Sequence, residues 1–298
     1  MKIAAPIVGA TAGPRVHEID ARWLMAYAAA LGDTAPEYLD TTRPDGIVAH
    51  PLFPVCYEWP LALDLRARTM SETIAARGVH ATHDLRLHRR PRPGDRLSTT
   101  AAVISAEPRS PGAYIVTRFE TVDADGRPVS TTDYGSIHRG VECDRAATTH
   151  PHPDPLPPRE RESGTLSPPG RGQGEGPPDW SASLRIASNL AHVYTECARI
   201  WNPIHIDKAV AKAAGLPAII LHGTATLALA VSEVLRRQPR AAATRVDRIG
   251  CRFRGMVSLP SALRLEAWAA PGRVDFRVVA SDGRPAIDDG YLQLAPPS

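Results

Sequence analysis

Two long stretches of the chain are apolar around most of the circumference of a helix. They run from about Leu52 to Arg68 and from about Gly223 to Arg237, and the pattern is typical of a helix that a sheet wraps. A shorter helical segment and a loop precede each stretch. After each, apolar and polar residues alternate and break at Asp-Gly pairs, which predicts antiparallel hairpins. The chain is therefore predicted to contain two copies of one unit: a helix, a loop, a long buried helix and a meander of strands.

The two units also align residue by residue. The segment ALGDTAPEYLD, which begins at Ala30, aligns without a gap with CARIWNPIHID, which begins at Cys197. In this alignment Tyr38 falls opposite His205, and Asp33 falls opposite Ile200. One unit alone would expose a sheet edge and a helix face. We therefore expect the two units to pack against each other in pseudo-twofold fashion.

The segment between the units, residues 148–179, is dominated by proline, glycine and charged residues. Such a segment cannot bury enough apolar surface to offset the entropy of ordering it. It is predicted to be a disordered linker, either an ordinary flexible tether or a translated intergenic repeat that entered the reading frame. It divides the chain into an N-terminal repeat, residues 1–147, and a C-terminal repeat, residues 180–298.

Composition and charge narrow the class of protein. A chain of 298 residues with 43% hydrophobic and 22% charged residues suits a soluble protein of two ordinary domains. The net charge of +3, without a block of like charges, argues against nucleic-acid binding. The N-terminus does not resemble a signal peptide, and no apolar run approaches the roughly 18 residues of a membrane span. We expect a cytoplasmic protein that binds neither nucleic acid nor a membrane.

The cysteines and histidines lack the spacing of metal ligands. The four cysteines are far apart and form no CxxC pair, so they are expected to be reduced thiols. His80, His83 and His88 lie in a stretch that alternates like a strand, which predicts that they point to both faces. No metal site is predicted.

Three segments of the C-terminal half together resemble a known family: WNPIHID from Trp201, AAGL from Ala213 and ILHGTATLALA from Ile220. The family is that of the (R)-specific enoyl-CoA hydratases, or MaoC-like dehydratases, of the fused double hot-dog type. The resemblance is strongest from Tyr194 to Arg237, and the N-terminal half is similar to the degenerate repeat of these proteins. It implies an α+β double hot-dog fold in which antiparallel sheet wraps one long helix per repeat, with the N-terminal repeat as substrate lid and tunnel.

The resemblance also implies a lyase of fatty acid metabolism that acts reversibly on 2-enoyl-CoA and 3-hydroxyacyl-CoA thioesters. It needs no cofactor beyond the acyl-CoA substrate. Carried over by position, His205 is the acid/base, Asn202 holds the loop and a water, and the Gly223 amide faces the thioester oxygen. A neutral imidazole suits the base near neutral pH, and an amide at a helix start suits an oxyanion. The family aspartate, two residues before Asn202, is Ile200 here.

Three alternatives are open for the group that carries out the second proton transfer. Glu196 lies four residues before Ile200, about one helical turn away. Asp33 keeps the aspartate position in the other repeat. In the third alternative His205 works alone and passes one proton between the α-carbon and the hydroxyl group.

Two other functions stay open at the level of the sequence. One is an acyl-CoA thioesterase, because hot-dog folds host both reactions and a fold does not decide a function. The other is a catalytically impaired acyl-CoA-binding homologue, because Ile200 replaces the aspartate. The fused repeat already supplies the dimer that single hot-dog domains form, so the chain is expected to be a monomer or a homodimer.

Overall fold

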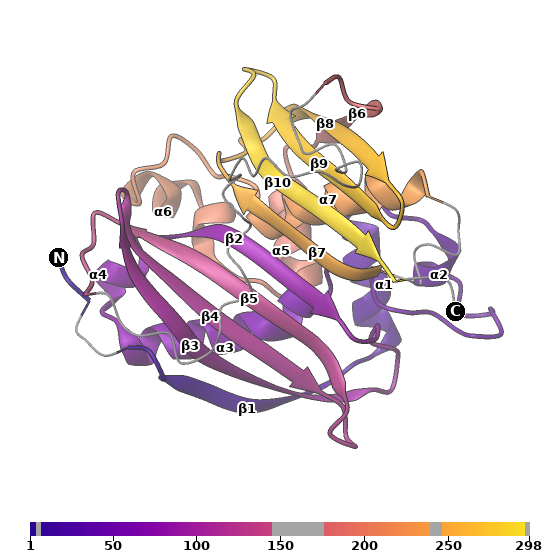
Figure 1. The fold of residues 1–298 in the computed structure, drawn as a ribbon, viewed down its shortest axis with the longest axis horizontal. Coiled ribbons are helices and arrows are strands. Elements are labelled where there is room, and N and C mark those ends of the chain that lie inside the picture. The colour runs from indigo at the N-terminus through magenta and orange to yellow at the C-terminus, as the bar shows by residue number, and fades with distance from the viewer. Residues whose placement is uncertain (4–6, 145–175, 239–245, 296–298) are drawn as a thin grey trace, which may run out of the picture.

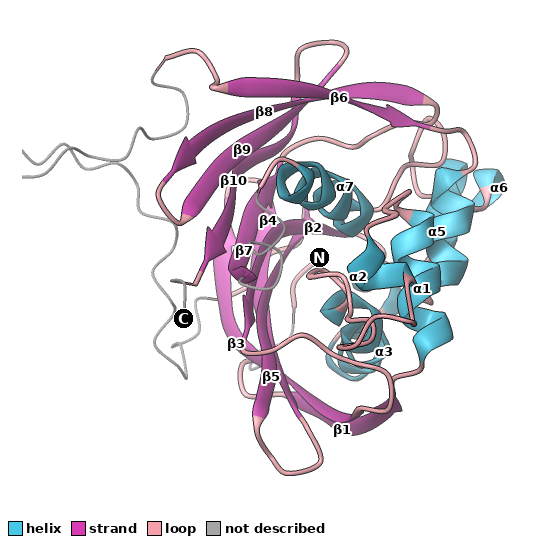
Figure 2. Cartoon of the chain, turned by 90° about the vertical axis from the view of Figure 1, so that its right-hand side faces the viewer, coloured by secondary structure: helices cyan, strands magenta, loops and turns pink. Residues whose placement is uncertain are grey.

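Two helices lie against the concave face of one curved antiparallel sheet (Figures 1 and 2). They are α3 (Pro54–Thr69) and α7 (Gly223–Arg236), which confirm the two predicted long helices to within two residues. This computed structural model describes residues 1–3, 7–144, 176–238 and 246–295. Within them, no helix has both the length and the apolar character that a membrane crossing requires.

The strands of the two repeats follow the same plan. In the order β1-β3-β4-β5-β2-β7-β10-β9-β8-β6, the second five strands mirror the first five, and β2 pairs antiparallel with β7 at the centre. This arrangement confirms the predicted pair of units, since each covers the sheet edge that the other would expose. The strands are β1 (Thr11–Glu18), β2 (Gly78–Leu87), β3 (Arg96–Arg109), β4 (Gly112–Val122), β5 (Pro128–Arg139), β6 (Trp180–Ile186), β7 (Val246–Phe253), β8 (Ser261–Ala270), β9 (Arg273–Ala280) and β10 (Pro285–Leu294).

The sequence analysis did not predict two strands, β1 and β6, which form the outer edges of the sheet. Only Ala12 of β1 is buried, and β6 buries Leu184 and Ile186 alone. β1 gives little alternation of apolar and polar residues, which is the signal that a strand prediction needs, whereas β6 (WSASLRI) does alternate and could have been found from the sequence.

The helices α1 (Ala21–Ala30), α2 (Pro36–Leu39), α5 (Leu190–Ala198) and α6 (Lys208–Ala213) stand at the open side of the two central ones (Figure 2). The predicted helix before each long helix is α1 in one repeat and α5 in the other. These two pack together, with the hydroxyl oxygens of Tyr27 and Tyr194 3.4 Å apart. Shorter turns complete the set: α2, α4 (Glu72–Ala75), a 3₁₀ turn (Pro203–His205) and α6.

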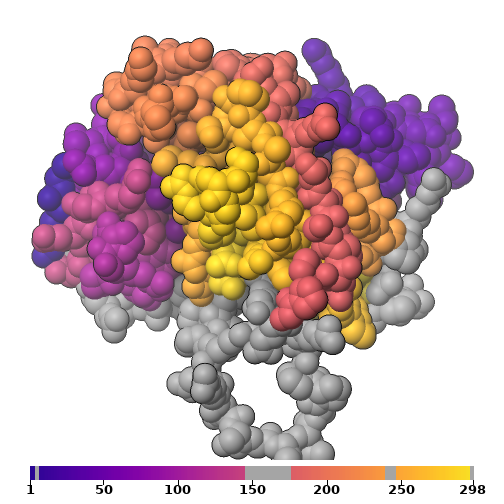
Figure 3. All heavy atoms as spheres, turned by 90° about the horizontal axis from the view of Figure 1, so that it is seen from above, coloured from indigo at the N-terminus to yellow at the C-terminus, as the bar shows by residue number. Residues whose placement is uncertain are grey.

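The repeats share their core. One cluster of buried apolar residues includes Leu24 and Phe53 from the N-terminal repeat and Leu227 and Phe276 from the C-terminal one. In the space-filling view, atoms of the N-terminal repeat lie on both sides of the C-terminal repeat (Figure 3). Neither repeat could separate without exposing this apolar surface to water.

The predicted linker falls mostly outside the described residues, and its disorder stays a prediction. Its last residues are described, and the Asp179 amide donates to the Ala267 carbonyl at 2.9 Å. Asp179 is therefore bonded to the C-terminal repeat, and the exact boundary between linker and repeat stays a prediction.

Candidate active site

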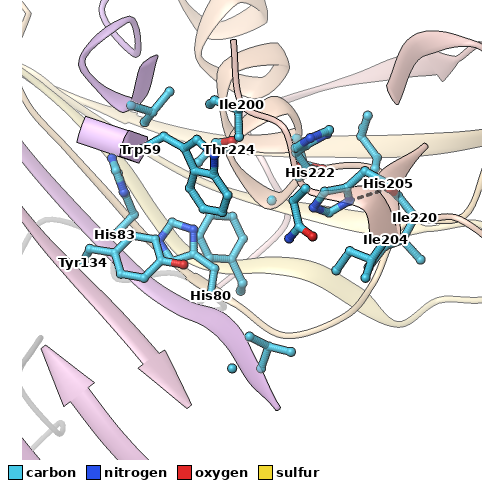
Figure 4. Close-up of a pocket in the computed structure, with 18 of the residues that line it drawn as sticks. Trp59, His80, His83, Tyr134, Ile200, Ile204, His205, Ile220, His222 and Thr224 are labelled. Atoms are coloured by element: carbon cyan, nitrogen blue, oxygen red, sulfur yellow. Dashed lines mark hydrogen bonds between the residues drawn. The ribbon is translucent and has the colours of Figure 1, made fainter. Parts of the chain in front are cut away.

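A pocket of about 1080 Å³, counted with its open mouth, lies where the two repeats meet (Figure 4). The N-terminal repeat contributes α3 and β2 to its wall. The C-terminal repeat contributes the loop around the 3₁₀ turn and the start of α7. The pocket therefore exists only when both repeats are folded together.

His205 is held in one tautomer by the segment that leads to α7. Its Nδ1 lies 2.8 Å from the carbonyl oxygen of Ile220, and since a carbonyl only accepts, Nδ1–H is the donor. The unprotonated Nε2 is left on the side of the ring away from Ile220, towards the cavity (Figure 4). Burial lowers the pKa of His205 to about 4, so the ring is neutral at pH 7. A neutral imidazole with a free lone pair is able to take a proton.

His222 lies directly against His205. The two rings stack with their centroids 3.7 Å apart, and His222 Nε2 lies 3.2 Å from the hydroxyl of Thr195. Burial, and then the neighbouring His205, hold the pKa of His222 well below its usual range. The stack therefore disfavours a charge on either ring and keeps the plane of His205 in place.

Asn202 and Gly223 reach the same pocket as His205. Asn202 is half-buried at the start of the 3₁₀ turn, where its carbonyl accepts from the His205 amide at 3.1 Å. Gly223 is the first residue of the 14-residue helix α7, where backbone amides give the helix its positive end. A Cβ at Gly223 would stand 3.1 Å from the ring of Phe253, so a side chain there would crowd the pocket wall.

The structure does not bring Glu196 to this pocket. Ile200 is 4% exposed and lines the cavity, but Glu196 is on the solvent face of α5 and is not in the lining. The reason is that Arg199 adopts the left-handed conformation, with φ of 57°, and ends the helix at Ala198. The expected spacing of one helical turn between Glu196 and Ile200 is therefore wrong, and the two residues do not share a helical face.

Asp33 is also outside the pocket lining. It is 3% exposed, and its carboxylate accepts from the Ala35 amide at 3.2 Å, within its own loop. Beside it, burial raises the pKa of Tyr38 to about 12, so this residue stays a neutral phenol where His205 stands in the other repeat. The fold keeps the site of the N-terminal repeat apart from the pocket, and a composite site that uses Asp33 is not formed.

The pocket contains a carboxyl group that the sequence analysis missed. Glu58 of α3 is 4% exposed and lines the cavity, and its Oε1 accepts a hydrogen bond from Thr132 at 2.6 Å. Burial raises the pKa of Glu58 to about 8, and the bond from Thr132 lowers it by less. A signal was present in the sequence: Glu58 is a carboxyl group within the apolar stretch PVCYEWPLAL, and α3 has one other, Asp64, in its more polar C-terminal part.

His80 and His83 both line the pocket, so the expectation that strand alternation separates them is corrected. A bulge in β2 between His80 and Thr82 inserts one residue and turns His80 to the side of His83. Their ring centroids lie 5.4 Å apart. Among the described residues, no group of three or more histidine, cysteine, aspartate or glutamate side chains is placed to hold a metal.

Comparisons with known families agree with both halves of this description. A model of the MaoC-like domain matches residues 173–283, and a model of the FAS1-like dehydratase domain region matches residues 6–132. The two matches lie in different repeats and together take in most of the chain.

Curated relatives are similar over part of their length. Peroxisomal multifunctional enzyme type 2 of Drosophila melanogaster is 28% identical over 204 residues, which are 66% of this chain and 31% of that one. The mouse protein of the same name is 34% identical over 125 residues, 41% of this chain and 17% of that one. Peroxisomal enoyl-CoA hydratase 2 of Arabidopsis thaliana is 31% identical over 94 residues, 32% of this chain and 30% of that one. The chain spans less than a third of each of these relatives.

Solved structures share the fold over the whole chain. A MaoC-like dehydratase from Phytophthora capsici superposes with a TM-score of 0.79 at 21% identity, covering 97% of this chain and 96% of that one. A Mycobacterium tuberculosis protein described as a double hotdog fold superposes with a TM-score of 0.59 at 18% identity, covering 97% and 96%. The chain therefore has the double hot-dog fold, with a C-terminal repeat that matches the MaoC-like domain and an N-terminal repeat that matches the FAS1-like dehydratase region.

Proposed function

We propose that the protein is a lyase that reversibly hydrates 2-enoyl-CoA thioesters to 3-hydroxyacyl-CoA thioesters. The observation that carries this proposal is the neutral His205, whose Nε2 faces the cavity beside the positive end of α7. The curated relatives named enoyl-CoA hydratase support the substrate class.

In the proposed reaction the thioester oxygen lies at the start of α7, against the Gly223 amide. Water attacks the β-carbon while His205 Nε2 takes one of its protons, and negative charge collects on the thioester oxygen. The same proton then passes from His205 to the α-carbon, so the product gains one water in total. Asn202, which lines the pocket beside the turn that carries His205, is proposed to hold that water.

This route uses His205 alone for both proton transfers. It is favoured over the two carboxylate alternatives because neither Glu196 nor Asp33 is in the pocket lining. Glu58 is in the lining, but a carboxyl group with a pKa of about 8 is mostly protonated at pH 7 and is a poor base there.

The test is the variant His205→Ala. General acid–base groups contribute about 10²–10⁴-fold, so hydration of a 2-enoyl-CoA, followed by loss of enoyl absorbance, should fall by at least about 10²-fold. The control is His88→Ala, because His88 is exposed directly after β2 and its side chain bonds only to Thr131 in the described part of the chain. Wild-type hydration by a folded His205→Ala protein would overturn the proposal.

A second candidate is an acyl-CoA-binding protein that no longer hydrates. Ile200 favours it, because this residue is buried and apolar where the family has a carboxylate. Binding of acyl-CoA without hydration or thiol release would identify this case, and thiol release from a saturated acyl-CoA would identify a thioesterase. The cytoplasmic location and the oligomeric state stay predictions, and several relatives are named peroxisomal.

A further inference from the structure

We propose that the part of the pocket built by the N-terminal repeat binds an uncharged oxygen, a hydroxyl or a keto group, on the acyl chain of the substrate. The inference rests on the proposed function, which places the thioester against His205 and α7. His205 and His222 border one end of the pocket, and His80, His83 and Tyr134 border the other (Figure 4). An acyl chain that leaves the thioester end therefore runs towards the second group.

Glu58 offers a hydrogen-bond donor in this part of the pocket. Its Oε1 already accepts from Thr132 at 2.6 Å, so the proton of the neutral carboxyl group is expected on Oε2. Among the described residues, Oε2 has no hydrogen-bond partner. Unlike the nitrogens of His83, Oε2 is not closed off from the cavity, so a ligand atom or a water is able to reach it.

His83 adds a second unsatisfied group to the same wall. It is 2% exposed, and neither Nδ1 nor Nε2 has a hydrogen-bond partner in the described structure. Burial lowers its pKa to about 4, so the ring is neutral and carries one donor and one acceptor. Its nitrogens are buried, and the ring of His80 lies beside it with the ring centroids 5.4 Å apart.

The rest of this wall suits the apolar part of an acyl group. The rings of His80 and Tyr134 stack with centroids 3.9 Å apart, and those of His80 and Phe253 lie 4.5 Å apart. Trp59 borders the same space. A purely aliphatic chain would fill it but leave Glu58 Oε2 without a partner, whereas an oxygen on the chain would supply one.

An uncharged oxygen fits better than a carboxylate. Glu58 and His83 are both neutral near pH 7, so they cannot supply the counter-charge that a buried carboxylate needs. Arg66 also lines the pocket, where it donates to the Tyr134 hydroxyl at 2.9 Å. Preferred binding of a terminal carboxylate would therefore point to Arg66 instead of Glu58.

The test compares binding of saturated acyl-CoA thioesters by calorimetry, which needs no turnover. At each chain length from roughly six to twelve carbons, three probes are compared: an acyl-CoA with a terminal methyl, one with a terminal hydroxyl and one with a terminal carboxylate. A gained hydrogen bond of about 1.4 kcal/mol is a tenfold change in affinity. We expect the hydroxyl probe to bind about tenfold more tightly than the methyl probe at one length.

Two variants assign that preference to Glu58. Glu58→Gln keeps an N–H donor and should keep the preference, whereas Glu58→Met removes the donor and should abolish it. Glu196→Met, the same change at an exposed position, is the matched control. Equal or better binding of the methyl probe at every length, preference for the carboxylate, or a preference that survives in Glu58→Met would overturn the inference. If the thioesters bind without preference, only this inference falls; if none binds, the proposed function falls as well.

Discussion

Replacing Glu58 by glutamine should change how the stability of the protein depends on pH. Burial raises the pKa of Glu58 from 4.5 to about 8 in the folded protein. The folded state therefore binds the proton more tightly than the unfolded state does. The contribution of the Glu58 proton to the stability of the folded protein is fully present below pH 4.5 and is lost as the pH rises through about 8. Glutamine has the same shape and does not titrate in this range.

The magnitude follows from the size of the shift. Each pKa unit corresponds to about 1.4 kcal/mol, so the whole shift is worth about 5 kcal/mol at most. Roughly 3–4 kcal/mol of this should be lost between pH 5 and pH 8. The histidines that burial holds neutral contribute in the opposite direction at acid pH, but they are common to both proteins. The difference between wild type and Glu58→Gln therefore isolates Glu58.

The assay is urea unfolding followed by circular dichroism at several pH values from 5 to 8. The free energy of unfolding of Glu58→Gln should rise relative to wild type by roughly 3–4 kcal/mol across this range. For the control Glu196→Gln, at an exposed carboxylate, the free energy of unfolding should change with pH in parallel with that of the wild type. Parallel curves for wild type and Glu58→Gln would mean that Glu58 is ionised in the folded protein at pH 7, and the argument from burial would fail.

Three further predictions follow from the same structure. Ile200→Asp returns a carboxylate to the pocket wall beside His205 and should raise hydration about tenfold or more; an unchanged rate would show that the site does not use this position. Because the folded pKa of His205 is about 4, kcat/KM should stay level from about pH 8 down to 5 and fall only below that, whereas a fall centred near 6.5 would contradict the neutral base. At the seam between the repeats, Arg248 Nε and Nη2 donate to Asp84 at 2.8 and 2.6 Å. Arg248→Met should lower the free energy of unfolding in urea by about 1 kcal/mol, and by less in high salt. The control is Arg284→Met, which breaks the exposed ion pair with Asp282 and should leave the free energy of unfolding unchanged.

Two features of the site could not be predicted from local sequence patterns. The alternation of β2 does not reveal the bulge before Thr82, because a bulge depends on how β5 pairs with β2 rather than on the residues of β2 alone. The spacing of Glu196 and Ile200 does not reveal that Arg199 turns left-handed and ends α5 between them. In both cases one backbone irregularity changed which side chain reaches the pocket.

The amino-acid sequence by itself determined the repeat, the two long helices, the hairpins and the residues of the loop that carries His205, because hydrophobic periodicity and short motifs are local properties of the chain. Only the tertiary structure decided that α3 of one repeat faces that loop of the other, which brings Glu58 and His83 into one pocket with His205 and leaves Asp33 outside. The physical reason is that pocket walls form between elements far apart in the chain. Burial there, rather than residue type, gives Glu58 its raised pKa and His205 its lowered one.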